Sequence, residues 1–66
     1  MTVIVHKALL ADIEAAIAAA EMSKAEFGVF AVNDPRLVFD LKKGRELRSK
    51  TQTRVTDAIE RIKARP

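Results

Sequence analysis

Apolar residues recur at spacings of three and four along most of the chain, which is the pattern of helices that bury one side. A first helix is predicted over Ala8–Glu21 and a last one from Ser49 to about Lys63. The apolar stripe of the first comprises Leu9, Leu10, Ile13, Ala16, Ile17 and Ala20, and that of the last comprises Val55, Ile59 and Ile62. Each helix therefore has a side to pack against the rest of the chain.

The clearest local signal is the start of a second helix at Ser23. The Ser23 hydroxyl can accept the amide hydrogen of Glu26 while the Glu26 carboxylate accepts that of Ser23, which is a capping box. Met22 and Phe27 occupy the positions of a hydrophobic staple, which fixes the direction of the incoming chain. Gly28 permits close contact with another helix. This helix is predicted to end near Ala31, with an inner side that comprises Phe27, Phe30 and Ala31.

The stretch from Val32 to Pro35 predicts a tight turn into a third helix. Asn33 tolerates left-handed backbone, Asp34 suits the N-cap, and Pro35 suits the first helical position. The third helix is predicted over about Pro35–Lys43, and Gly44 ends it with left-handed backbone. Its buried side comprises Val38 and Leu41, with Leu37 half-buried beside them.

The remaining segments complete a single all-α domain over residues 1–66. Residues 45–48 are predicted as a loop, and Ser49 with Gln52 has the spacing of a second capping box. Thr2–Val5 is rich in β-branched residues and favours a short extended N-terminal arm. The predicted order is therefore an arm followed by four helices.

Composition narrows the class of protein. The 66 residues include no cysteine, so helix packing or a partner subunit must stabilise the domain in place of disulfides or a thiolate metal site. No apolar run approaches the roughly 18 residues of a membrane span. We therefore expect a cytoplasmic protein without membrane contact.

The charge is unevenly distributed along the chain. Residues 1–35 hold two Lys or Arg against five Asp or Glu, whereas residues 36–66 hold ten against four. A basic half of this kind favours a surface that binds a polyanion such as nucleic acid, although solvated helices also carry isolated cations. The segment from Arg36 to Arg54 concentrates the positive charge and is the predicted contact region.

Two short helices joined by a tight turn have the outline of a helix-turn-helix motif. Between Ser23 and Arg54 the chain resembles the Cro/CI family of phage-repressor-like domains: a capped Ser opens the second helix, Phe27-Gly28 is an apolar-small pair, and Lys43-Gly44 closes the third helix. Asn33 stands where the family often has Gly, and Lys42 where it often has an acidic residue. The resemblance implies a four-helix lambda repressor-like fold that binds double-stranded DNA.

In that fold the third helix would be the recognition helix, whose outward residues enter the major groove. The predicted base-reading residues are Arg36, Phe39, Asp40 and Lys43. Arg36 can form two hydrogen bonds with a guanine, and Asp40 can orient Arg36 or accept a hydrogen bond from cytosine. Phe39 can contact a thymine methyl group, or equally the core or a protein partner.

Cations and amides at the edges of the groove would hold phosphates. Ser23 and Lys24, at the start of the second helix, are placed for one DNA strand. The predicted contacts to the other strand are Lys42, Arg45, Arg48, Ser49, Lys50 and Thr51, and Lys43 can reach it as well. The remaining cations of residues 36–66 are expected on a solvated side of the last helix: Arg54, Arg61, Lys63 and Arg65.

No pattern indicates catalysis, a cofactor, a metal site or a small-molecule substrate. His6 is the only histidine, and its place near the N-terminus predicts a surface residue. Asp12 and Glu14 are two apart on a helix and do not share a side. The chain has no nucleophile-base pair and no glycine-rich phosphate loop, so we do not expect an enzyme.

The sequence is therefore interpreted as a DNA-binding transcriptional regulator of bacterial or phage type. A homodimer is expected because one such domain makes few base contacts. Its interface would be the Thr2–Val5 arm or the outer side of the last helix. Two alternatives remain. One is an architectural or excision factor that bends DNA. The other is a protein-interaction module, an antirepressor or adaptor, which Phe39 and Asp40 favour.

Overall fold

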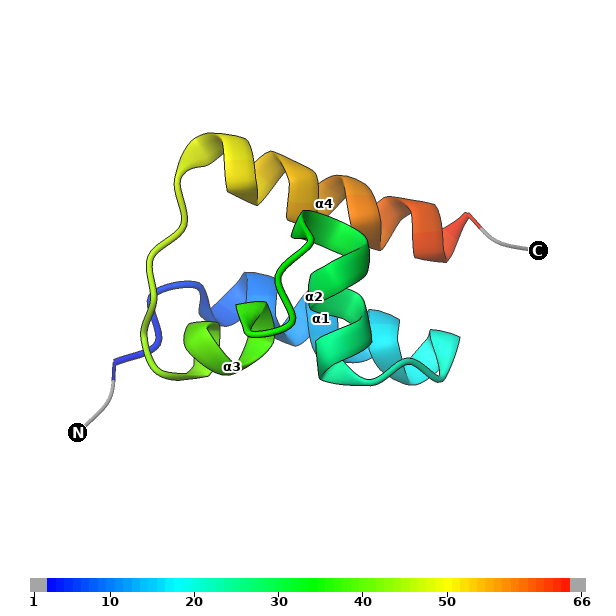
Figure 1. Cartoon of the computed structure of the whole chain (residues 1–66), viewed down its shortest axis with the longest axis horizontal. Coiled ribbons are helices and arrows are strands. Elements are labelled where there is room, and N and C mark those ends of the chain that lie inside the picture. The colour runs from blue at the N-terminus through cyan, green and yellow to red at the C-terminus, as the bar shows by residue number, and fades with distance from the viewer. Residues whose placement is uncertain (1–2, 65–66) are drawn as a thin grey trace.

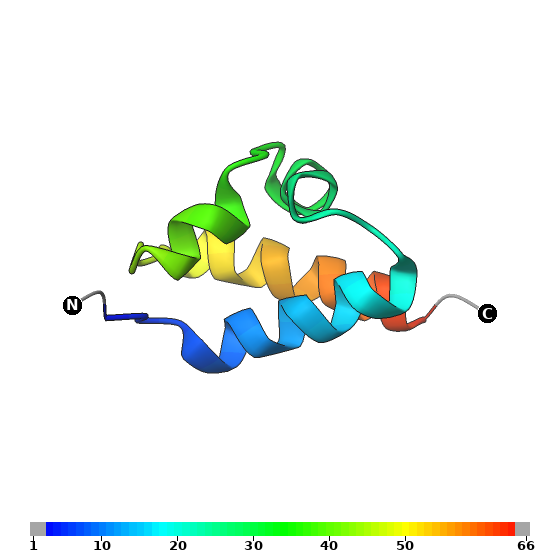
Figure 2. The same ribbon diagram turned by 90° about the horizontal axis from the view of Figure 1, so that it is seen from below.

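The computed structural model describes residues 3–64 and contains four α-helices. They are α1 (Lys7–Ala20), α2 (Lys24–Val32), α3 (Leu37–Lys42) and α4 (Ser49–Lys63). α1 and α4 lie side by side and run in the same direction, while α2 and α3 lie across one side of this pair (Figures 1 and 2). The prediction of an all-α domain with four helices is confirmed for the described residues, in which no strand occurs.

A single apolar core joins all four helices. The buried residues are Leu10, Ile13, Ala16, Ile17, Phe27, Leu37, Val38, Leu41, Leu47, Val55, Ala58, Ile59 and Ile62. The apolar stripes predicted for the first and last helices are confirmed, except that Leu9 and Ala20 are only partly buried at the edge of the core. No polar or charged residue of the described chain is buried, so apolar burial accounts for the core.

Two predictions about the core are wrong. Phe30 is 36% exposed, because the buried side of α2 is centred between Phe27, Gly28 and Ala31 and Phe30 lies off that arc. Leu37, predicted at a half-buried flank, is 0% exposed. Leu37 is the first residue of α3 and packs directly against α2 beside Gly28, where no side chain separates the two backbones.

The structure contains the interactions that were predicted to begin and end α2. The Glu26 amide donates to the Ser23 hydroxyl at 3.0 Å, and the Ser23 amide donates to the Glu26 carboxylate at 2.9 Å. Met22 and Phe27 belong to the same apolar cluster, as the staple requires. Asn33 has the expected left-handed backbone, with φ 57°. The helix includes Val32, one residue more than predicted.

Left-handed residues also end α1 and α3. Gly44, with φ 97°, follows α3 as predicted, and the amides of Gly44 and Arg45 donate to the carbonyls of Leu41 and Asp40 in a Schellman motif. α1 ends in the same way on Glu21, with φ 55°. The first helix therefore covers Lys7–Ala20 rather than the predicted Ala8–Glu21, because a left-handed residue cannot continue a helix.

The start of α3 differs from the prediction. The carboxylate of Asp34 accepts the Arg36 amide at 2.9 Å, and the carbonyl of Asp34 accepts the Leu37 amide at 3.2 Å. Asp34 thus satisfies amides at the helix start, as an N-cap would, but residues 34–36 form a turn ahead of the helix. α3 covers Leu37–Lys42, which is shorter than the predicted Pro35–Lys43.

Gly28 lies at the closest approach between α2 and the turn into α3. A Cβ atom at this position would overlap the carbonyl oxygen of Asp34 and would lie 3.3 Å from the Cβ of Leu37. The Asp34 amide also donates to the Gly28 carbonyl at 3.1 Å. The predicted close contact of Gly28 with another helix is therefore confirmed, and Gly28 also contacts the turn before α3.

The N-terminal segment is held to the loop between α3 and α4. His6 is partly buried, and its Nε2 atom accepts the Leu47 amide hydrogen at 2.9 Å. The prediction of a surface histidine is wrong, because the side chain folds back onto a buried part of the loop. Val3 and Val5 are 75% and 50% exposed, and Thr2 of the predicted arm lies outside the described residues.

Candidate nucleic-acid interface

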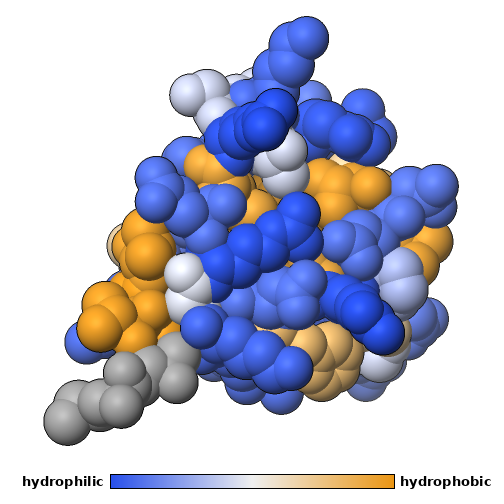
Figure 3. All heavy atoms as spheres, turned by 60° about the vertical axis from the view of Figure 1, so that its left-hand side comes forward, coloured by the Kyte–Doolittle hydropathy of each residue, from blue (hydrophilic) through white to orange (hydrophobic). Residues whose placement is uncertain are grey.

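α3, the α3–α4 loop and the start of α4 lie at one end of the molecule (Figure 1). Figure 3 views this end directly and shows mostly hydrophilic side chains, with an apolar area next to the N-terminal residues. The residues predicted to bind DNA belong to these segments, to the start of α2 or, in the case of Arg36, to the turn before α3. The fold thus gathers predicted contacts from three helices.

The predicted base-reading residues do not share one environment. Arg36, Phe39 and Lys43 are exposed, and Phe39 is exposed to 46%. The guanidinium of Arg36 forms no ion pair within residues 3–64 and is open to solvent. Asp40 is partly buried, and its carboxylate accepts a hydrogen bond from Arg45.

Arg45 connects the two ends of α3. One guanidinium nitrogen lies 3.2 Å from the carboxylate of Asp34 before the helix and 3.2 Å from that of Asp40 within it. The three side chains are each about one-third to two-fifths exposed, so solvent weakens these pairs. Arg45 was predicted to bind phosphate, and in the structure its charge is matched by two carboxylates that hold the turn.

Acidification is expected to loosen this turn. The hydrogen bond from the Arg36 amide, followed by that from Arg45, lowers the pKa of Asp34 below its usual 3.8. A lowered folded-state pKa stabilises the fold above about pH 4, and this stability is lost as the pH falls through the folded-state pKa. Urea unfolding at pH 7 and at pH 3 should therefore show a smaller pH effect for Asp34→Asn than for the unchanged chain. Asp57→Asn is the control, and equal pH effects in all three proteins would contradict the expectation.

Lys24 and Lys42 meet beside Phe39, although they come from different helices. The Lys24 ammonium lies 6.0 Å from the centre of the Phe39 ring, and Lys42 forms a 3.3 Å ion pair with Glu14 of α1. A hydrogen bond with Lys42, together with its charge, lowers the pKa of Lys24. The two cations were predicted to hold opposite DNA strands, and the structure instead makes them neighbours. Two adjacent ammonium groups favour a shared anion.

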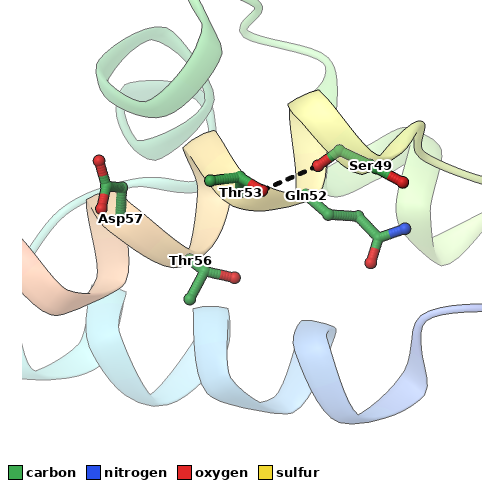
Figure 4. A pocket seen from close by; sticks show the side chains of 5 residues that line it. All are labelled: Ser49, Gln52, Thr53, Thr56 and Asp57. Carbon is green, nitrogen blue, oxygen red and sulfur yellow. Dashed lines mark hydrogen bonds between the residues drawn. The ribbon is translucent and has the colours of Figure 1, made fainter.

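The start of α4 offers unoccupied amides to the same end of the molecule. The predicted capping box of Ser49 and Gln52 is wrong: Arg48 is the N-cap residue, without a side-chain bond, and Ser49 is already helical. The Gln52 amide group donates to the Leu47 carbonyl at 3.0 Å. Figure 4 shows Gln52 directed away from Ser49 toward α1, while the Thr53 hydroxyl donates to the Ser49 carbonyl at 3.0 Å.

The other predicted phosphate contacts surround these amides. Arg48, Ser49 and Lys50 are exposed, and Thr51 is partly buried. Helix N-termini attract anions through their free amides and the helix dipole. A shallow groove beside them is lined by polar residues of α4: Ser49, Gln52, Thr53, Thr56 and Asp57 (Figure 4).

Residues 3–64 contain no helix long and apolar enough to cross a membrane. Over the same range, no three His, Asp or Glu side chains lie close enough together to hold a metal ion. Comparison with known proteins gave no match, whether to a family model, to a curated protein or to a solved structure.

Proposed function

We propose that this chain is a sequence-specific, double-stranded DNA-binding transcriptional regulator of bacterial or phage type. α2 and α3 would form the helix-turn-helix of a lambda repressor-like fold. The capped start of α2, the left-handed Asn33 and the short α3 with one buried side support this proposal. The observation that carries it is a set of at least partly exposed cations on α3, on the residues that flank it and at the starts of α2 and α4. They are Lys24, Arg36, Lys42, Lys43, Arg48 and Lys50.

In this proposal α3 enters the major groove with Arg36 leading. Arg36 pairs with a guanine edge, Phe39 contacts a thymine methyl group, and Lys43 reaches a base or a nearby phosphate. Lys24 and Lys42 hold one phosphate between them. Asp40 and Arg45 support the helix from behind and make no direct contact with DNA.

The free amides of α4, with Arg48 and Lys50, hold a second stretch of backbone. Two copies of the chain would read two half-sites, since a single short recognition helix contacts few bases. If about five or six phosphates are neutralised, log K falls with log salt at a slope near −5.

Binding to a pool of random DNA duplexes at two salt concentrations, followed by sequencing of the retained DNA, tests the proposal. Enrichment of a short two-fold symmetric motif that persists at the higher salt is the expected result. Salt-sensitive retention without a motif would instead indicate an architectural factor, because phosphate contacts alone carry no sequence information. No retention at either salt would contradict DNA binding.

One observation favours a second function, that of a protein-interaction module. Phe39 exposes a large apolar ring at the centre of the surface, and Glu14, Asp34 and Asp40 match the charges of Lys42 and Arg45. An antirepressor or adaptor would use such a mixed surface against a protein. In that case Phe39→Ala would abolish the partner complex, whereas Arg36→Ala would have little effect.

A further inference from the structure

An apolar strip on α2 and just before it lies at the edge of the core and stays partly exposed. It comprises Met22, Ala25, Val29 and Phe30, and we call it the α2 strip. With Glu26 these residues line a shallow groove of about 450 Å³. Val29 is 49% exposed and Phe30 36%, so large apolar side chains face solvent here. The proposed DNA contacts include none of them.

The two edges of the α2 strip carry different charges. Glu21 precedes Met22 directly, and Glu26 lines the groove itself, so one edge is acidic. Hydrogen bonds from Ser23 lower the pKa of Glu26, which keeps its carboxylate ionised. On the other edge a second groove joins Phe30 and Ala31 to residues of α4. The α4 residues that line it are Arg54, Asp57, Ala58 and Arg61.

The basic edge is available to an acidic group. Arg54 and Arg61 are exposed, and neither forms an ion pair within residues 3–64. Asp57 lies between them in the sequence and offsets part of their charge. Phe30 lines both grooves and therefore marks the middle of the surface.

We propose that the α2 strip is the docking surface for a second copy of this chain, across a two-fold axis near Phe30. A two-fold interface places the same surface on both copies, so it must complement itself. An apolar middle with acidic and basic edges meets this condition, since the Glu21–Glu26 edge of each copy faces the arginines of the other. This dimer proposal rests on the proposed function in one respect: the dimer would serve to read two half-sites of DNA.

This surface also leaves the outward side of α3 open. The residues of α2 that face the core and the start of α3 are Phe27 and Gly28, and neither belongs to the strip. The N-terminal segment, in contrast, lies at the end of the molecule where α3 is exposed (Figure 1). Pairing through α2 therefore keeps the dimer contact apart from the DNA contacts.

Sedimentation equilibrium of the free protein, without DNA, tests the surface. The unchanged chain is expected to form a dimer, and Val29→Lys is expected to raise the dimer dissociation constant about tenfold or more, because it places an unpaired charge in the middle of the interface. Val5→Lys is the matched control, since Val5 is 50% exposed and lies outside the strip. Thermal melting of both variants, in which each is expected to unfold cooperatively, checks that they fold.

A charge exchange tests how the two copies are arranged. Arg61→Glu alone should weaken the dimer, and Arg61→Glu combined with Glu21→Arg should restore it. Three results would overturn the proposal. The unchanged chain could be monomeric, the dimer could be weakened by Val5→Lys but not by Val29→Lys, or the Arg61→Glu, Glu21→Arg double variant could fail to restore association. Because DNA is absent, failure of DNA binding would not alter these results.

Discussion

Replacing Gly28 by Ala is expected to lower the free energy of unfolding by roughly 3 kcal/mol, as an overpacked core contact does. The new methyl group would overlap the Asp34 carbonyl oxygen, which is backbone and cannot rotate away. Relief requires α2 to move from the turn, which strains the bond from the Asp34 amide to the Gly28 carbonyl. The total free energy of unfolding of a chain of 66 residues is roughly 3–10 kcal/mol. The melting temperature should therefore fall by more than about 10 °C.

The sign of this effect makes the experiment informative. In an open helical position Ala is more favourable than Gly by about 1 kcal/mol, so propensity alone predicts that Gly28→Ala stabilises α2. Ala15→Gly, at an exposed position of α1, measures that propensity in the same protein. Circular dichroism melts of the two variants should therefore both shift downward. A higher melting temperature for Gly28→Ala would contradict the close approach of α2 and the turn.

Replacing Arg36 by Ala is expected to cost about 1–3 kcal/mol of DNA binding at the best site and to relax the preference at one base pair. Under the proposed function, the loss would arise because two hydrogen bonds to a guanine edge disappear. The Arg36 amide keeps its bond to Asp34, so the start of α3 should be undisturbed. Titration against the enriched duplex and its single-base variants measures both the affinity and the preference.

Two further variants separate base reading from charge. Arg36→Lys keeps the charge but cannot offer the planar pair of donors, so it should lose the preference as Arg36→Ala does. Lys50→Ala would remove a proposed phosphate contact, so it should weaken all sequences alike and reduce the salt dependence. If Arg36→Ala also weakened all sequences alike, Arg36 would be a phosphate contact and another residue would read the base.

The fold could be predicted from the sequence where local chemistry decides it. The capping box at Ser23 and the left-handed residues Asn33 and Gly44 each act within a few residues, and the structure has all three. Glu21 was missed because a carboxylic side chain gives no sign of left-handed backbone. The start of α3 was misplaced because Asp34 bonds to the second residue after it, which forms a turn before the helix begins.

The candidate site was harder to predict because its contacts join distant parts of the chain. Charge density singled out residues 36–54 as the candidate segment, but it did not show that Arg45 is matched by Asp34 and Asp40. The proximity of Lys24 and Lys42 depends on the angle between α2 and α3, which no local pattern specifies. The bond from the Leu47 amide to His6 joins residues 41 positions apart and left no local signal.

The placement of residues 3–6 and of the end of α4 bears on how the protein can be handled. The N-terminal segment lies beside α3 and is attached through His6 to the α3–α4 loop, whereas α4 leaves the fold at the opposite end of the molecule (Figure 1). A purification tag or fluorophore joined ahead of residue 3 would stand next to the proposed DNA surface. One joined after residue 64 would stand far from it. Immobilisation through the C-terminal side therefore leaves α3 accessible to DNA in solution.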